Sequence, residues 1–299
     1  MLTIQQRSNI MQPTMQPRII TASASRATVQ RVIEPVIHET DEEILERLET
    51  RFTILEEMTR AVKRGDVRGM IVSGPPGVGK SFGVEKVLSK HDFFADVAQD
   101  DSLRKYEIAK GNISALGLYQ MLWNYRDKKS IIVFDDCDCV LFDDLSLNVL
   151  KAALDTGKKR TLSWHTESKV LKEAGIPNSF NFEGGCVFIT NVKFDHVRSK
   201  KLRDHLDALE SRCHYLDLTI DTDREKMLRI KQMVGHGMLD RYQFEGDEPQ
   251  EIMDYLDANK HRMRELSLRM VIKVADLRKS MPKSWKSVAS ITCMRKESE

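Results

Sequence analysis

Apolar residues along the middle of the chain follow two kinds of pattern. Short apolar runs, typical of buried strands, occur at residues 70–72, 131–134, 187–190 and 215–218, with a weaker candidate at 106–108. Apolar residues at helical spacing predict helices between these runs, at residues 81–90, 116–125, 145–154 and 200–210. Strands that alternate with helices predict an α/β fold, with a mostly parallel sheet covered by helices on both faces.

The two ends of the chain follow other patterns. Acidic residues open a helical pattern at residue 41, and Gly65 ends it after two basic residues. Beyond Asp221 the strand signals fade, and three helices are predicted at residues 224–234, 251–256 and 263–277. We therefore divide the chain into four parts: a disordered arm over 1–39, an α/β domain over 40–220, a small helical unit over 221–281 and a polar tail over 282–299.

Composition excludes several classes of protein. The 299 residues include 47 Lys and Arg against 45 Asp and Glu, so the net charge is +2 and any contact with nucleic acid must be local. No apolar run approaches the ~20 residues of a membrane span, which argues against an integral membrane protein. Five scattered cysteines do not suit a disulfide scaffold and indicate reduced thiols in a cytoplasmic protein. The first 33 residues lack Asp and Glu, a composition shared by disordered arms and organellar targeting peptides.

A phosphate-binding loop is the strongest chemical signal. The motif G-x-x-x-x-G-K-S/T is matched in full, after a predicted strand and before a predicted helix, by Gly74, Pro75, Pro76, Gly77, Val78, Gly79, Lys80 and Ser81. Glycines let the backbone direct its N–H groups at phosphate oxygens, and the helix N-terminus adds positive charge. We expect Lys80 to reach the β- and γ-phosphates of ATP and Ser81 to join the Mg²⁺ shell.

Two carboxylates follow the strand at 131–134. The carboxyl end of a buried strand is where open α/β sheets bind their ligands. We expect Asp135 to hold Mg²⁺, directly or through water, and Asp136 to polarise the attacking water as a general base. Two solvated acids in a turn are the simpler interpretation, and the upstream phosphate loop argues against it.

Together these motifs resemble the AAA+ ATPases, over residues 40–280. The resemblance implies a P-loop NTPase core with a C-terminal helical lid, and a homo-oligomeric ring with shared ATP sites. It also implies that Asn191 senses the γ-phosphate and that Arg212, in Ser-Arg-Cys, is the arginine finger for the neighbouring subunit. Arg198 and Arg203 are weaker candidates for the finger. Arg264 matches the arginine of the third lid helix, and Arg269 is the alternative.

The chain departs from most AAA+ members in having Asp135-Asp136 where they have Asp-Glu, and it lacks the collar domain of clamp loaders. Its compact plan resembles stand-alone AAA+ ATPases of tailed phages. Residues 158–185 predict a hairpin, which either contacts single-stranded or duplex DNA through Lys158, Lys159, Arg160 and Trp164 or packs on its own subunit. A second basic cluster, residues 193–203, either meets DNA or a neighbouring subunit or is a solvated face.

Three functions follow from these features. The first is an ATP-driven motor or loader that acts on a replication or recombination complex. The second is a chaperone that remodels a protein client, and the third is a small-molecule kinase, against which Asn191, Arg212 and the lid argue. The expected location is the cytoplasm, or the host cytoplasm if the protein is viral.

Overall fold

The computed structural model describes residues 39–89, 92–100 and 103–296. Residues 1–38 of the predicted arm and the last three residues of the predicted tail lie outside this range. Short 3₁₀ turns occur at Phe194–His196 and Asp240–Tyr242. The strands are β1 (Gly69–Ser73), β2 (Tyr106–Lys110), β3 (Ile131–Asp135), β4 (Thr161–Ser163), β5 (Ser179–Asn181), β6 (Gly185–Thr190) and β7 (His214–Asp217). The helices are α1 (Asp41–Arg64), α2 (Lys80–Leu88), α3 (Phe93–Ala98), α4 (Ala115–Asn124), α5 (Cys139–Phe142), α6 (Asp144–Ala153), α7 (Lys169–Glu173), α8 (Lys200–Glu210), α9 (Asp223–Gly235), α10 (Glu248–Asn259), α11 (Leu268–Ser280) and α12 (Trp285–Thr292).

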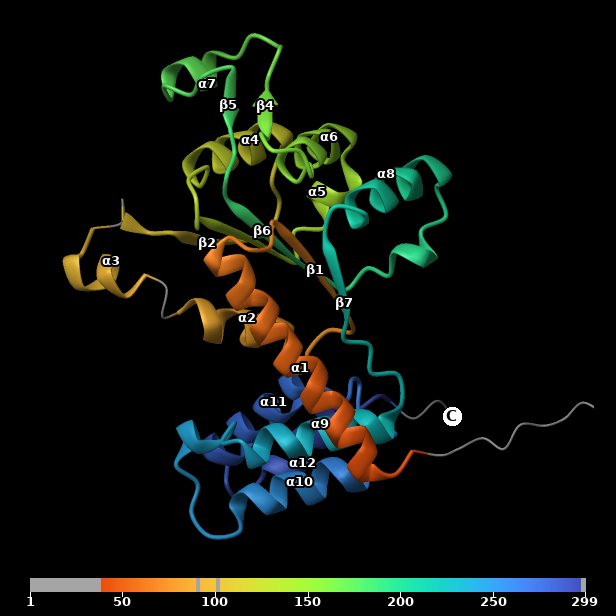
Figure 1. The fold of residues 1–299 in the computed structure, drawn as a ribbon. Helices are drawn as coiled ribbons and strands as arrows, with labels where there is room; N and C mark the ends of the chain where they lie inside the picture. The colour runs from red at the N-terminus through yellow and green to blue at the C-terminus, as the bar shows by residue number, and fades with distance from the viewer. Residues whose placement is uncertain (1–38, 90–91, 101–102, 297–299) are drawn as a thin grey trace, which may run out of the picture. The chain divides into compact units, whose positions relative to one another are not determined.

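A five-stranded parallel sheet in the order β2-β3-β6-β1-β7 forms the centre of the fold (Figure 1). Alternate residues of each central strand enter different apolar clusters, as the pleat of a strand requires. On β3, Ile131 and Val133 pack with α1 and α2, whereas Ile132 and Phe134 pack with α4 and α6. Both faces are therefore buried, and the prediction of an α/β fold with a mostly parallel, doubly covered sheet is confirmed.

Local signals account for the helix that opens the described chain. The Thr40 hydroxyl accepts a hydrogen bond from the Glu43 amide while the Glu43 carboxylate accepts from the Thr40 amide, which is a capping box. At the other end Gly65 takes the left-handed conformation, with φ of 83°, that a glycine cap permits. The apolar face between the caps, which includes Leu48 and Leu55, is buried against the sheet and α2.

Most predicted elements are confirmed within a few residues, and α8 has the predicted bounds. The hairpin predicted in residues 158–185 is also present: β4 and β5 pair antiparallel, with Thr161 opposite Asn181. Between them lies α7, a short helix that the sequence pattern did not predict. In Figure 1 this hairpin and α7 project on the side of the sheet that carries α4 and α6.

The third helix of the C-terminal region begins later than predicted. It starts at Leu268, because Ser267 is extended (φ −154°) and its hydroxyl accepts a hydrogen bond from the Met270 amide. Met263 lies before the helix and is buried by an antiparallel bridge to Met294. The apolar spacing that suggested a helix from residue 263 therefore has another cause, which is burial by a distant segment.

The predicted polar tail over residues 282–299 is wrong, because α12 occupies much of it. Trp285 is 3% exposed, and its ring meets Tyr255 edge-on with the ring centroids 5.0 Å apart. Ala289 and Cys293 are buried in the same apolar cluster, which α9, α10 and α11 share. In Figure 1 these helices gather near the N-terminal half of α1. The helical C-terminal region thus has four helices and its own apolar core.

Replacement of Trp285 by alanine should lower the free energy of unfolding by about 3–5 kcal/mol, because it leaves a large cavity in this core. Urea denaturation followed by circular dichroism measures the change. Ile291 is the matched control: it lies on the same helix and is 77% exposed, so Ile291→Ala should change stability by no more than about 0.5 kcal/mol. Equal effects of the two substitutions would mean that α12 does not pack as described.

All five cysteines are free thiols, and Cys137, Cys186 and Cys293 are buried. Burial raises the pKa of Cys137 to about 11 and that of Cys213 to about 12, so both are protonated at neutral pH. The prediction of unpaired, partly buried thiols is confirmed. Among the residues that the structure describes, none of the helices combines the length and the apolar character that a bilayer span requires.

Candidate functional site

The phosphate loop connects β1 to α2 and is closed by its own lysine. Lys80 Nζ donates hydrogen bonds to the carbonyl oxygens of Gly74 at 2.7 Å and Pro75 at 2.9 Å, and to Asn191 Oδ1 at 2.7 Å. Burial lowers the pKa of Lys80 to about 8, and Asp136 opposes part of this effect. The loop therefore holds a buried ammonium group at the carboxyl edge of the sheet, next to the residue that follows β6.

The loop also packs against the helical region. Gly77 has φ of 72°, and a Cβ there would lie 2.8 Å from the Ser267 Cβ, so glycine is needed for both conformation and space. The Leu268 amide donates a hydrogen bond of 2.9 Å to the Gly77 carbonyl. The first turn of α11 is thereby fixed to the phosphate loop.

The two residues predicted to hold Mg²⁺ are in contact. Ser81 Oγ donates a hydrogen bond of 2.8 Å to Asp135 Oδ1, and Asp135 is only 5% exposed. Two adjacent oxygen ligands suit Mg²⁺, which takes few protein ligands and keeps several waters or phosphate oxygens. No cluster of three or more His, Cys, Asp or Glu side chains with the spacing of a metal site occurs within residues 39–89, 92–100 and 103–296.

Lys110 is a residue of this site that the sequence analysis missed. It ends β2 directly opposite Asp135 in the register of the sheet. Its Nζ lies 3.2 Å from Asp135 Oδ2 and 3.2 Å from Glu85 Oε1, and these contacts raise its pKa. Parallel strands bring their carboxyl ends to one edge of a sheet, so a lysine that ends a predicted strand is a candidate for this site. The sequence does not show that β2 pairs with β3, and without that pairing Lys110 cannot be placed beside Asp135.

Asp136 and Asn191 follow the neighbouring strands β3 and β6, at the same edge of the sheet as Ser81 and Asp135. Asn191 Nδ2 donates a hydrogen bond of 3.0 Å to Asp136 Oδ1, so Asn191 links the Lys80 ammonium to the Asp136 carboxylate. Asp136 has φ of 54°, in the left-handed region that Asp and Asn tolerate better than most residues. Five predicted residues thus gather at one edge of the sheet and are connected by hydrogen bonds in two sets, Lys80–Asn191–Asp136 and Ser81–Asp135.

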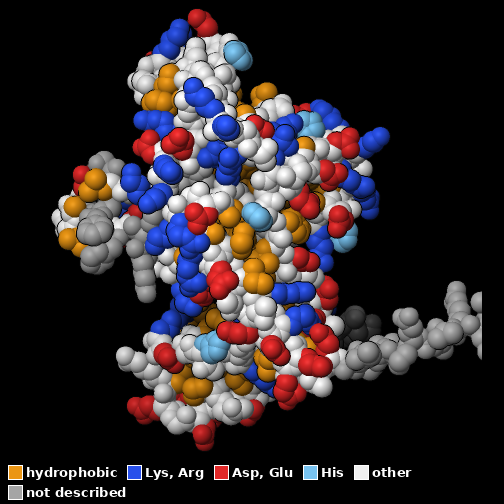
Figure 2. Space-filling view, in the orientation of Figure 1, with side chains coloured by type: hydrophobic (Ala, Val, Ile, Leu, Met, Phe, Trp, Pro, Cys, Tyr) orange, Lys and Arg blue, Asp and Glu red, His pale blue; other side chains and the backbone are white. Residues whose placement is uncertain are grey.

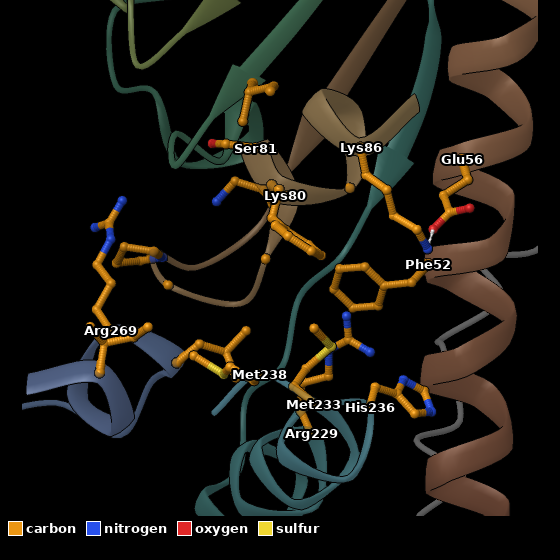
Figure 3. Close-up of a pocket in the computed structure, with 18 of the residues that line it drawn as sticks. Phe52, Glu56, Lys80, Ser81, Lys86, Arg229, Met233, His236, Met238 and Arg269 are labelled. Carbon is orange, nitrogen blue, oxygen red and sulfur yellow. Dashed lines mark hydrogen bonds and ion pairs between the residues drawn. The ribbon is translucent and has the colours of Figure 1, made fainter. Parts of the chain in front are cut away.

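A cavity of about 750 Å³, here named the main cavity, adjoins this group. Its walls come from the phosphate loop and α2, from α1, from the ends of β3 and β6, and from α9, α11 and the segment after α9. Figure 3 shows Phe52 of α1 above Arg229 of α9, with Met233 and Met238 beside them and Lys80 and Ser81 across the cavity. The sequence analysis named none of the residues from α1 and α9 as site residues, because only the fold brings them to the loop.

Arg264, the first choice for the lid arginine, does not line the main cavity. Its amide and its Nε bond to the carbonyl oxygens of Cys293 and Met294, at 2.9 and 3.1 Å. Arg269, the alternative, lines the cavity, and its charge contributes, after burial and Asp136, to the shift of the Lys80 pKa. The prediction placed Arg264 at the start of a helix that in fact begins at Leu268, and one turn of difference decides which arginine faces the loop.

Arg212 lies away from the main cavity of its own chain. It follows α8, its Nη1 donates to the Ala208 carbonyl, and its buried Nε has no hydrogen-bond partner. It borders a separate hollow of about 560 Å³ together with Lys151, Lys159 and Arg160. The predicted role of Arg212 concerns a neighbouring subunit, so it stays a prediction.

Two of the predicted DNA contacts pack on their own chain. Arg160 Nη1 donates a hydrogen bond of 2.9 Å to the Ala153 carbonyl, and its guanidinium lies 5.1 Å from the centre of the Phe182 ring. Burial lowers the pKa of Arg160. Trp164 packs against Tyr119 with ring centroids 5.5 Å apart. Of the four residues proposed for DNA contact, Lys158 and Lys159 are exposed.

Comparison with known proteins shows a relative of this chain in a bacteriophage. No family model matches the chain. The uncharacterized 36.7 kDa protein in the nrdC-mobD intergenic region of Enterobacteria phage T4 is 36% identical over 258 residues, which cover 85% of this chain and 77% of the phage protein. An identity of this size over most of both chains shows common ancestry, and the chain belongs to the same family as this T4 protein.

Proposed function

We propose that this protein is a Mg²⁺-dependent ATPase of the AAA+ class that works as a homo-oligomeric ring. The observation that carries the proposal is the connected group at the sheet edge, in which Lys80, Asn191 and Asp136 form one chain of hydrogen bonds and Ser81 and Asp135 another. A phosphate loop, an oxygen pair suited to Mg²⁺ and a carboxylate beside them are the parts that phosphoryl transfer needs.

Each residue has a role in this proposal. The loop amides and Lys80 hold the phosphates, and Ser81 with Asp135 would hold Mg²⁺, which neutralises charge on the phosphate oxygens. Asp136 accepts the proton of the attacking water, and Asn191 orients that water or the γ-phosphate. Arg269 supports the phosphates from α11, and Arg212 of one subunit reaches the nucleotide of the next.

The first candidate substrate of such a motor is a nucleic-acid complex. On the face shown in Figure 2, acidic side chains predominate around α9 to α12, whereas Lys and Arg are more frequent nearer the sheet and the hairpin. Lys158 and Lys159, which precede β4 in the chain, are exposed and can contact phosphates. The phage relative supports action in the cytoplasm of an infected cell.

A protein client is the second candidate, and the hairpin favours it. Arg160 and Trp164 pack on their own chain, which removes two of the four DNA contacts. Val170 of α7, in the hairpin connection, is 50% exposed and presents an apolar side chain. An apolar side chain can contact an apolar client segment, whereas it offers a phosphate backbone neither a charge nor a hydrogen-bond donor.

The test is ATP turnover of the full chain at high protein concentration, with Mg²⁺, with and without single-stranded DNA. We expect turnover that needs Mg²⁺, and stimulation by DNA if nucleic acid is the substrate. Unstimulated turnover would favour the protein client. Absence of nucleotide binding and of turnover would overturn the proposal.

The same assay tests the shared site. Arg212→Ala should reduce turnover without loss of ATP affinity, and mixing it with Lys80→Ala chains should restore part of the activity, because intact halves then meet at some interfaces. Without restoration on mixing, the ring with shared sites would have to be abandoned.

A further inference from the structure

Arg229 of α9 is a buried cation that the proposed phosphate chemistry does not use. The residue is only 6% exposed. Its guanidinium carbon lies over Phe52, 3.4 Å from the ring centre, and its Nη1 donates a hydrogen bond of 2.6 Å to Gln232 Oε1. Its Nε is buried and has no hydrogen-bond partner. The main cavity is the space that this side chain borders.

The surroundings of Arg229 compensate its charge poorly. None of the ion pairs within the described part of the chain includes it. The acid that acts on it is Glu49, which is bonded to Gln232 at 2.7 Å and so reaches Arg229 through that amide. Burial lowers the pKa of Arg229 to about 10, which leaves it charged at neutral pH. A buried charge without a direct partner costs stability, and groups of this kind concentrate at functional sites.

The position of Arg229 limits what it can bind. Its Nη2 lies 3.7 Å from the point that a Cβ on Gly79 would occupy, so the guanidinium adjoins the last turn of the phosphate loop. Lys80 and Ser81 line the cavity on the side of the sheet edge, where the phosphates are expected. The cavity beyond the loop is lined by apolar side chains, those of Phe52, Met233, Met238, Leu268 and Ile272, and by polar ones at its border, those of Glu49, Thr53, Glu56, His236 and Arg241. A flat, apolar ligand with hydrogen-bond acceptors on its edge suits this region.

We propose that Arg229 recognises the nucleobase, with its Nη2, which adjoins the phosphate loop, donating a hydrogen bond to a ring acceptor of a purine. This inference rests on the proposed nucleotide site and assigns its specificity. A guanidinium presents several N–H donors in one plane, and a purine offers the N7 acceptor on the edge of its five-membered ring, which a pyrimidine lacks. The two fused rings also fill more of the apolar space than a single ring. Arg229 therefore selects purine over pyrimidine nucleotides.

The test is equilibrium binding of fluorescently labelled ATP and CTP to the full chain, for the wild type and for Arg229→Met. Methionine keeps most of the apolar volume and removes every donor. We expect the wild type to bind the ATP probe about tenfold tighter or more, and Arg229→Met to lose about tenfold in ATP affinity while CTP affinity changes little. Arg224→Met is the matched control: Arg224 is exposed on the same helix, pairs with Asp41 and does not line the cavity.

The thermal midpoint of the ligand-free protein separates recognition from structural support. We expect Arg229→Met not to lower it, because an uncompensated buried charge is replaced by an apolar group. Arg229→Gln, which retains two donors, should restore part of the preference for ATP. An unchanged ratio of ATP to CTP affinity in Arg229→Met would overturn the proposal, as would equal wild-type affinity for both probes. Purine-selective binding without hydrolysis would instead contradict the proposed ATPase and leave Arg229 as the base-reading residue.

Discussion

Replacing Lys80 by alanine is expected to weaken ATP binding by about 100-fold or more and to abolish turnover. Lys80 supplies the one side-chain ammonium inside the phosphate loop, where it now bonds to Gly74, Pro75 and Asn191. Hydrogen bonds to charged groups contribute about 1.5–3 kcal/mol each, so the loss of two phosphate contacts accounts for this factor. The alanine variant should fold, because the removed charge is buried and its desolvation opposes folding.

Titration of a fluorescent ATP analogue measures the effect, with circular dichroism to verify the fold. Lys86→Ala is the matched control, since Lys86 lies on the same helix and borders the same cavity but is exposed and paired with Glu56 at 2.6 Å. Its removal should change ATP affinity by no more than a few-fold, as for other surface ion pairs. Equal, small effects of both substitutions would remove the phosphate-loop assignment.

Asp136→Asn is expected to reduce turnover by about 100-fold or more while ATP binding is retained. A positioned general base contributes about 10²- to 10⁴-fold to rate, and the amide of asparagine cannot accept the proton. Asparagine preserves the shape of the side chain and also tolerates the left-handed backbone of this position, where φ is 54°. The substitution therefore removes the base with little change to the strand end.

Turnover is measured as release of phosphate and ATP affinity by titration of the ATP analogue, both on the same preparation. Asp138→Asn is the control, because Asp138 accepts a hydrogen bond of 2.6 Å from Thr190 and does not line the main cavity. It should leave turnover within a few-fold of the wild type. Normal turnover in Asp136→Asn would mean that another group accepts the proton.

The sequence predicts those parts of the fold whose causes are local. The strands that become β1, β3 and β6 are buried on both faces, so they appear as continuous apolar runs. Helix α1 is bounded by a capping box and a glycine cap, and both are visible in the sequence. The phosphate loop is equally local, because its eight residues are contiguous and its conformation depends on its own glycines.

Burial by distant segments accounts for the errors. Met263 is apolar because it pairs with Met294, and helical periodicity cannot distinguish this from the face of a helix. Met294 comes directly after α12, in the segment that the sequence pattern predicts as a polar tail. Trp285 and Ala289 in this segment do have helical spacing, but two apolar positions are too few to predict a helix. The early helix start favoured Arg264 over Arg269, the alternative, and of the two Arg269 lines the main cavity.

The candidate site also has one side that the sequence predicts from local motifs and one side that only the fold brings together. Its phosphate side is formed by a contiguous motif and by strand ends, which sequence reasoning located by residue number. Its other side includes Phe52 and Arg229, which lie far apart in the sequence, on α1 and α9, and meet only in the fold. On a single sequence, a phenylalanine and an arginine at helical positions look like a core residue and a surface residue.

The walls of the main cavity are made at very different times during synthesis. Phe52 leaves the ribosome long before Arg229, Leu268 and Ile272, because synthesis proceeds from the N-terminus. The sheet also depends on the late segment, because Leu228 of α9 belongs to the apolar cluster that covers β1 and β6. A nascent or proteolysed chain that ends after β7 therefore contains all five strands of the central sheet and the whole phosphate loop. It lacks Leu228 over the sheet and the wall of the main cavity that α9 and α11 form. The helical C-terminal region has its own apolar core, but it also supplies Leu228 to the apolar cluster over β1 and β6 and one wall of the main cavity, so its loss leaves both incomplete.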